Sequence, residues 1–234
     1  MLKIAVIIPA AGTGQRLGYK TGKPYIKLNN KALVSYCLEM FEKTPAITDI
    51  IIAVEKAQLK KANNLVKLLG LSKLKAVVCG GVTRSESVYN ALKFLAKDTD
   101  YVLIHDAARP FVNQDLINSC ITAAVKYKAV ICAVPCMATI KSVDKNRNVI
   151  STLDRNSLWQ VQTPQAFSYK LIMLAYAKAE KKKLAFFDDA SLVEKIPHKV
   201  KIVMGFNNNI KITTKEDLEL ANAILKAGKR FALS

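Results

Sequence analysis

The chain opens with an apolar run that leads directly into a glycine-rich, basic loop. Residues 4–8 are all aliphatic, and residues 9–18 contain three glycines and Arg16. A short continuous apolar run is typical of a strand that is buried on both faces, as in a parallel sheet. Glycines let backbone amides approach a ligand closely, because no side chain lies in the way. We therefore predict a phosphate-binding loop at the C-terminal end of the first strand.

The spacing of the glycines excludes the two commonest phosphate-binding motifs. A dinucleotide fingerprint needs Gly-x-Gly-x-x-Gly, but the glycine that follows Gly12 and Gly14 is Gly18, one position late. A P-loop needs Gly-Lys followed by Ser or Thr, and this triplet does not occur in the chain. A different nucleotide loop and a plain glycine-rich turn both remain open on this feature alone.

Predicted strands and helices alternate along the chain. The strands are expected at about 4–10, 47–55, 74–79, 100–105 and 129–135, and the helices at about 33–43, 57–70, 85–96, 114–126, 168–182 and 215–227. A further short strand is expected at 209–213, before a helix with Thr214 as its N-cap. Alternation of this kind indicates an α/β fold, with a Rossmann-like, mostly parallel sheet and helices on both faces. Without repeats or linkers, residues 1–234 are predicted to form one domain.

Residues 137–160 interrupt this alternation, and we call them the β-arm. Residues 139–143 and 149–153 lie on either side of a polar turn and predict a β-hairpin. A two-stranded hairpin is only marginally stable by itself in water. We therefore expect the β-arm to protrude and to pack against a second subunit, which would make the protein a homodimer.

The formal net charge of +18 needs an explanation. Such a charge can indicate nucleic-acid binding, but the lysines are scattered over predicted helices without interleaved aromatic residues. A positive field also attracts small anions, so a small phosphorylated substrate is preferred to a polynucleotide. Only six of the 36 basic residues are arginine. In such a chain an arginine is expected where a planar fork must bind phosphate.

The sequence also predicts the cellular compartment of the protein. No apolar run approaches the roughly 18–20 residues of a membrane span, and the N-terminal residues resemble no signal peptide. The five cysteines are odd in number and match neither zinc-site nor redox-motif spacing. We expect a cytoplasmic protein with buried, reduced thiols and without a membrane partner.

Polar motifs follow the third and fourth predicted strands, where a doubly wound sheet binds its ligands. Gly80-Gly81 is followed by the hydroxyls of Ser85 and Ser87 at the start of a predicted helix, which suits an anion site or simple capping by Ser85. Asp106 follows the next strand, where a carboxylate suits Mg²⁺ or a sugar hydroxyl.

The alternative role for Asp106 is a cap of the following helix. This is less favoured because that helix is expected to begin near Asn113. His105 is expected to be a packed, neutral histidine rather than a catalytic base.

Six motifs occur in the order found in one enzyme family. They are Pro9-Ala10-Ala11-Gly12-x-Gly14-x-Arg16-Leu17, Gly80-Gly81-x-x-Arg84-x-x-Ser87-Val88, His105-Asp106-Ala107-Ala108-Arg109-Pro110, Asp154-Arg155-Asn156, Thr163-Pro164-Gln165 and Asn209-Ile210-Lys211. The chain resembles the 2-C-methyl-D-erythritol 4-phosphate cytidylyltransferases over almost its full length. These enzymes make a CDP-linked sugar alcohol in the non-mevalonate isoprenoid pathway. The sister family, the ribitol-5-phosphate cytidylyltransferases, is the alternative within the class. A non-catalytic nucleotide-binding protein and a nucleic-acid-binding module are the alternatives outside it.

The resemblance implies a role for each matching residue. The nucleotide, CTP, would be surrounded by Ala10, Ala11, Gly12, Gly80 and Ser87. Arg16 and Lys23 would stabilise charge at the α-phosphorus. The sugar-alcohol phosphate would be positioned by Arg155 and Lys211 and lined by Asp106, Arg109, Thr139 and Thr163. Mg²⁺ is the expected cofactor, with Asp106 as its candidate ligand.

The chain departs from the family pattern in two places. Lys23 lies in Gly22-Lys23-Pro24 where the family has Pro-Lys-Gln, so Lys20 and Lys27 are alternatives to Lys23. Phe187 occupies the position of a threonine that touches the nucleotide in the family, so that contact is expected to be lost or replaced.

Overall fold

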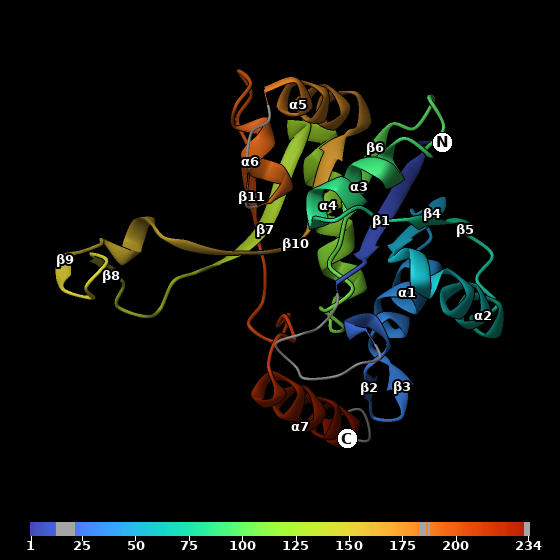
Figure 1. Cartoon of the computed structure of the whole chain (residues 1–234), viewed down its shortest axis with the longest axis horizontal. Coiled ribbons are helices and arrows are strands. Elements are labelled where there is room, and N and C mark those ends of the chain that lie inside the picture. The colour runs from blue at the N-terminus through green and yellow to red at the C-terminus, as the bar shows by residue number, and fades with distance from the viewer. Residues whose placement is uncertain (13–21, 183–185, 187, 232–234) are drawn as a thin grey trace.

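A seven-stranded sheet forms the centre of the chain (Figure 1). The computed structural model describes residues 1–12, 22–182, 186 and 188–231. The strands, in spatial order, are β11 (Lys201–Met204), β7 (Ala129–Pro135), β10 (Trp159–Ser168), β6 (Tyr101–Ile104), β1 (Ile4–Ala10), β4 (Asp49–Val54) and β5 (Leu74–Cys79). All neighbours are parallel except β10, which is antiparallel to β6 and to β7. The mostly parallel sheet predicted from the sequence is confirmed.

Helices cover both faces of this sheet. One face packs against α1 (Leu33–Lys43), α2 (Leu59–Leu69) and α4 (Gln114–Tyr127), and the other against α3 (Arg84–Leu92), α5 (Tyr169–Lys182) and α6 (Asp189–Val193). Side chains alternate along β1, so Val6 and Ile8 join the first core, and Ala5 and Ile7 join the second. Burial on both faces explains why the strand is aliphatic throughout.

A third, smaller core lies beside the sheet. The helix α7 (Lys215–Phe231) packs there against a short hairpin of β2 (Lys27–Leu28) and β3 (Lys31–Ala32). Short 3₁₀ turns complete the described elements at η2 (Lys23–Tyr25), η3 (Lys56–Gln58) and η4 (Arg155–Ser157). Ile212 is fully buried in this third core, which anchors the segment before α7.

The five predicted sheet strands all exist within two residues of their expected bounds, but β10 and β11 were not predicted. β10 contains Pro164 and three glutamines, and its pairing with β7 shifts between Val161 and Gln165, so it lacks an apolar signature. The prediction of a strand at 209–213 is wrong, because these residues form no β-bridge with another strand. The apolar alternation of Ile210 and Ile212 there reflects docking onto the third core.

The N-termini of three helices show which polar residues serve as caps. The side chain of Thr83, not the predicted Ser85, accepts from the amide of Glu86 and forms a capping box at the start of α3. The cap of α4 is Asn113, whose side chain accepts from Leu116. Thr214 caps α7 as predicted, since it accepts from the amide of Asp217. Asp106 therefore caps none of these helices.

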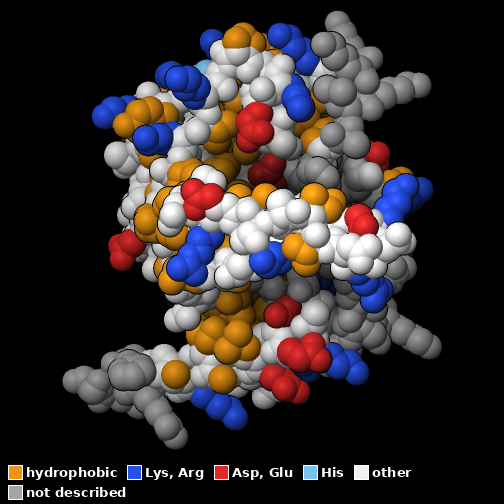
Figure 2. All heavy atoms as spheres, turned by 90° about the vertical axis from the view of Figure 1, so that its left-hand side faces the viewer, with side chains coloured by type: hydrophobic (Ala, Val, Ile, Leu, Met, Phe, Trp, Pro, Cys, Tyr) orange, Lys and Arg blue, Asp and Glu red, His pale blue; other side chains and the backbone are white. Residues whose placement is uncertain are grey.

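The β-arm projects from the body of the molecule (Figure 1). It contains a hairpin of β8 (Lys141–Val143) and β9 (Val149–Thr152), followed by η4. Apolar side chains are exposed along it, namely those of Met137, Val143, Val149, Ile150 and Leu153. Figure 2 views the molecule from the side on which the β-arm projects, and shows apolar groups interspersed with basic ones. An exposed apolar hairpin is typical of a surface that pairs with another molecule.

All five cysteines, which lie within the described part of the chain, are free thiols. Four of them are buried as expected, but Cys79 is exposed. The expectation of five buried thiols is therefore wrong for Cys79, because it is the last residue of β5, which is an edge strand of the sheet.

Candidate active site

A pocket of about 480 Å³ lies at the carboxyl ends of the central strands. Its wall is formed by the end of β1 with Gly12, by Lys23 and Pro24, by residues 81–84 with Ser87, by residues 106–108, and by Lys211 and Thr213. Ligands bind at this edge of doubly wound sheets because loops from several strands converge there. Of the residues predicted for the site, seven line this pocket, namely Ala10, Ala11, Gly12, Lys23, Ser87, Asp106 and Lys211.

One side of the pocket consists of small residues packed closely together. Gly80 lies behind this wall, where an added Cβ would be 2.7 Å from Ser87 Oγ and 2.8 Å from the Cβ of Ala11. Ser87 is buried, and its hydroxyl accepts from the amide of Gly81 and donates to the carbonyl of Thr83. The hydroxyl thus shapes the turn that precedes α3. Close packing of this kind leaves no room for a larger side chain at Gly80.

The glycine-rich loop begins and ends at the pocket. The amide of Lys23 donates to the carbonyl of Gly12 at 3.3 Å, so the two ends of the loop are held together. Lys23 borders the pocket, whereas Lys27 lies on β2 and is not among the pocket residues. This placement favours Lys23 over Lys27 for the predicted role. Arg16 and Lys20 lie outside the described residues.

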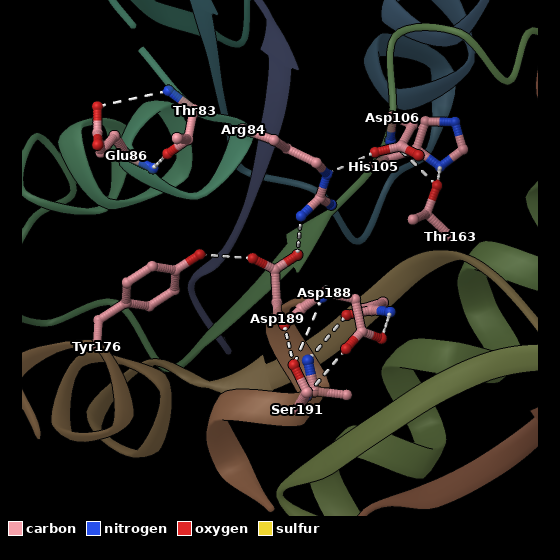
Figure 3. Close-up of polar contacts among 12 residues, drawn as sticks. Thr83, Arg84, Glu86, His105, Asp106, Thr163, Tyr176, Asp188, Asp189 and Ser191 are labelled. Atoms are coloured by element: carbon pink, nitrogen blue, oxygen red, sulfur yellow. Dashed lines mark hydrogen bonds and ion pairs between the residues drawn. The ribbon is translucent and has the colours of Figure 1, made fainter. Parts of the chain in front are cut away.

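Three cations surround the buried carboxylate of Asp106, and Figure 3 shows one of them, Arg84. Arg84 Nε lies 2.9 Å from Oδ1, Lys211 Nζ lies 2.7 Å from Oδ2, and Arg109 Nε lies 4.0 Å from Oδ2. Burial by itself would raise the pKa of Asp106, but these cations hold it well below its usual range. Asp106 is therefore charged at any physiological pH, and it pairs with Lys211 in the wall of the pocket.

Behind Asp106 a chain of hydrogen bonds passes through Thr163 and His105 (Figure 3). The amide of Asp106 donates to Thr163 Oγ1 at 3.0 Å, and the hydroxyl of Thr163 lies 3.1 Å from His105 Nδ1. His105 Nε2 lies 3.0 Å from the carbonyl of Arg109, which can only accept, so Nε2 carries the proton. Burial lowers the pKa of His105 to about 4. The histidine is thus a neutral packing residue as predicted, and Thr163 supports the loop from behind the pocket.

Arg84 connects Asp106 to a second buried carboxylate, which the sequence reasoning missed. Arg84 Nη1 lies 2.7 Å from Asp189 Oδ2, and the hydroxyl of Tyr176 donates to Asp189 Oδ1 at 2.6 Å. Burial and the neighbouring Asp189 raise the pKa of Tyr176 well above its usual value. The scarcity of arginine was the signal that could have identified Arg84, although its partners proved to be carboxylates rather than phosphate.

Five of the predicted residues that the structure describes do not line this pocket within one chain, namely Gly80 and Thr163, which lie behind it, and Arg109, Thr139 and Arg155. Thr139 and Arg155 lie on the β-arm and are exposed, and Arg155 Nη1 donates to the carbonyl of Met137 at 3.2 Å. Arg109 is buried, with its guanidinium hydrogen-bonded to backbone carbonyls, so its expected place in the pocket lining is wrong. Phe187 lies outside the described residues.

The wall of small residues and the cluster of cations face the same space at the strand ends. An anionic ligand with a small base fits such a space, and the class that the fold and site define is an α/β nucleotidyltransferase. The family model "2-C-methyl-D-erythritol 4-phosphate cytidylyltransferase" matches residues 4–227.

Known proteins of this family are similar to the chain over most of its length. Enzymes of that name from Alkaliphilus oremlandii and Clostridium tetani are 44% and 42% identical, covering 96% of this chain in each case and 95% and 91% of the relatives. The crystal structure of 4-diphosphocytidyl-2C-methyl-D-erythritol synthase from Anaerococcus prevotii superposes with a TM-score of 0.87 at 33% identity, covering 96% of each chain. The chain belongs to the 2-C-methyl-D-erythritol 4-phosphate cytidylyltransferase family.

The close packing at Gly80 generates a prediction about nucleotide binding. Gly80→Ala should raise the Michaelis constant for CTP by on the order of tenfold or more, because the new methyl group overpacks the wall against Ser87. Gly228→Ala is the matched control, since an added Cβ there meets nothing within 4 Å. Steady-state kinetics against CTP checks this, and an unchanged constant in Gly80→Ala would show that this wall does not bind the base.

Burial of neutral His105 generates a prediction about pH. Because the folded pKa of about 4 is below the ordinary value of 6.5, the unfolded state binds the extra proton as the pH falls. The contribution of His105 to the free energy of unfolding is fully present above about pH 6.5. It is lost as the pH falls toward 4, at up to about 1.4 kcal/mol per pH unit. Urea unfolding between about pH 7 and pH 5 should therefore show a smaller pH slope in His105→Gln than in wild type. His198→Gln, on the surface, is the control, and equal slopes in all three proteins would contradict the assignment.

Proposed function

We propose that the pocket around Asp106 and Lys211 is where this chain carries out the cytidylyl transfer of its family. CMP is transferred from CTP to 2-C-methyl-D-erythritol 4-phosphate (methylerythritol phosphate), giving 4-diphosphocytidyl-2-C-methyl-D-erythritol and pyrophosphate. The observation that supports this location is the meeting of the small-residue wall with Lys23 and Lys211 across one space. The wall accommodates the pyrimidine, and the lysines lie where phosphates would be bound.

The reaction forms one bond and breaks one bond at the α-phosphorus of CTP. A phosphate oxygen of methylerythritol phosphate attacks this phosphorus, and the bond to the β-phosphate breaks as pyrophosphate leaves. The attacking group is already an oxyanion at neutral pH, so no side chain has to remove a proton. Catalysis then depends on positioning and on charge stabilisation, which Lys23 and Arg16 would supply. Lys211 and Arg155 would position the methylerythritol phosphate.

Mg²⁺ is proposed as the cofactor, but the surroundings of Asp106 do not suit a metal ligand. One of its oxygens is paired with Arg84 and the other with Lys211, and Arg109 is a third cation nearby. Within the described part of the chain, no group of three or more His, Cys, Asp or Glu could hold a metal ion. Mg²⁺ is commonly bound through substrate phosphates with few protein ligands. We infer that it would enter with the triphosphate rather than on Asp106.

A homodimer formed through the β-arm is the proposed assembly. The β-arm exposes apolar side chains, and an isolated hairpin gains little stability by itself. Its residues Thr139 and Arg155 lie away from the pocket of their own chain, which suits a β-arm that completes the site of a partner subunit.

A single domain over residues 1–234, with a β-arm, and a cytoplasmic location are likewise proposals. In the described segments no helix is both long and apolar enough to cross a membrane. The expected ligands are small molecules, CTP and methylerythritol phosphate, rather than nucleic acid.

A substrate panel tests the proposed activity directly. Pyrophosphate release should require CTP, Mg²⁺ and methylerythritol phosphate together, and should fail with ATP, GTP or UTP at equal concentration. Ribitol 5-phosphate should be a poor acceptor. Equal or faster turnover with ribitol 5-phosphate would assign the chain to the sister activity, and nucleotide binding without turnover would indicate a non-catalytic protein.

The role of the β-arm generates a second test. Arg155→Lys should raise the Michaelis constant for methylerythritol phosphate by roughly tenfold, because an ammonium cannot replace a guanidinium fork on a phosphate. The constant for CTP should stay nearly unchanged. Sedimentation should show a dimer that Ile150→Asp, on the β-arm, disrupts with loss of activity. A fully active monomer would rule out the β-arm as part of the site.

A further inference from the structure

Lys211 reaches Asp106 from a segment that has no regular secondary structure. Residues 205–214 form neither helix nor strand, although Lys211 Nζ lies 2.7 Å from Asp106 Oδ2. The side chain of Lys211 is 39% exposed, so packing alone does not fix it. The segment is tied to the loop after β6 by one backbone bond, from the amide of Ile212 to the carbonyl of Ala108 at 2.9 Å. Ile212 is also buried in the third core, and side-chain hydrogen bonds at Asn209 hold the backbone on the other side of this lysine.

The guanidinium of Arg109 supplies such contacts. Its Nη1 donates to the carbonyl of Asn209 at 2.6 Å, and its Nη2 donates to the carbonyl of Val161 at 3.3 Å. The side chain is only 11% exposed. Arg109 thus joins three separate parts of the chain, namely the loop after β6, the start of β10 and the segment before α7. Two of its nitrogens are thus hydrogen-bonded to carbonyls, whereas its buried Nε has no hydrogen-bond partner among the described residues and lies 4.0 Å from Asp106 Oδ2.

Asn209 completes the attachment from the other side. It is fully buried, and its amide nitrogen donates to the carbonyl of Thr163 at 2.9 Å and to Gln162 Oε1 at 3.2 Å. The amide of Gln162 in turn donates to the carbonyl of Phe206 at 3.0 Å. Gly205 lies against the same group, since an added Cβ would be 2.5 Å from Gln162 Oε1. We call Arg109, Gln162 and Asn209 the latch.

We propose that Arg109 is a positioning residue, which acts through the latch to hold Lys211 at the pocket rather than contacting substrate itself. The proposal rests on the function proposed above for Lys211. It explains why an arginine is used at this position in a chain rich in lysine. The planar fork can donate to two carbonyls at once, whereas an ammonium on a flexible stem cannot reproduce that geometry.

A change in the latch is expected to affect the binding of methylerythritol phosphate but not that of CTP. The latch controls the segment that carries Lys211, while Ala10, Ala11 and Ser87 are held by β1 and α3. Loosening the latch should therefore weaken the use of methylerythritol phosphate and leave CTP binding intact. Misplacement of a binding group by about 1 Å can reduce a rate on the order of 10²-fold.

The first experiment is a kinetic cycle with Arg109→Lys, Lys211→Ala and the double variant. Arg109→Lys should raise the Michaelis constant for methylerythritol phosphate on the order of 10–100-fold without changing that for CTP. The double variant should be no worse than Lys211→Ala alone, because residues that act through each other are not additive. Arg230→Lys, the same chemical change near the end of α7, is the control. Additive losses would show that Arg109 binds substrate directly, and equal losses for both substrates would indicate general destabilisation. Either result overturns the proposal.

Hydrogen exchange provides a readout that does not depend on turnover. The amide of Ile212 should exchange faster in Arg109→Lys and in Asn209→Ala than in wild type, because both changes loosen the latch. It should remain protected in Lys211→Ala, which leaves the latch intact. Unchanged protection in Arg109→Lys would overturn the proposal even if the enzyme proved inactive. An inactive wild type with the expected exchange pattern would instead contradict only the proposed function.

Discussion

The pairing of Asp106 with Arg84 and Lys211 is the interaction on which the site depends. A carboxylate taken out of water is costly unless cations and hydrogen bonds replace its solvation. The three partners come from the end of β6, the start of α3 and the segment before α7. Their pairing therefore requires that elements distant in sequence meet at one edge of the sheet. The pocket lies between these elements, where they converge at this edge of the sheet.

Support for this pairing extends deep into the molecule. Asp189 is fully buried and pairs with Arg84 and Tyr176, so the position of Arg84 is determined from both ends. Such fixed charges suit a reaction in which charge is stabilised rather than protons moved. The site is accordingly rich in Arg and Lys, and its one histidine, His105, is neutral and serves as a hydrogen-bonding spacer.

The parts of the fold that were predictable share one physical property. β1, β4 and β7 are buried on both faces, so their sequences are almost uninterrupted aliphatic runs. β10 lacks this signature because Gln162, Thr163 and Gln165 are buried there for their hydrogen bonds. The site was likewise predictable only in part. Motif residues with small side chains line the pocket together with the paired charges of Asp106 and Lys211, but the guanidinium of the motif residue Arg109 donates to backbone carbonyls instead.

The sequence by itself determined the α/β class, the loop after the first strand, the protruding hairpin and the family motifs. These are encoded locally, in short apolar runs, glycines and ordered motifs that each need only neighbouring residues to be recognised. Only the tertiary structure decided which charges are partners. Whether an arginine binds phosphate or protein depends on the groups that folding brings within about 3 Å, and those of Arg84 and Arg109 lie up to 105 residues away along the chain.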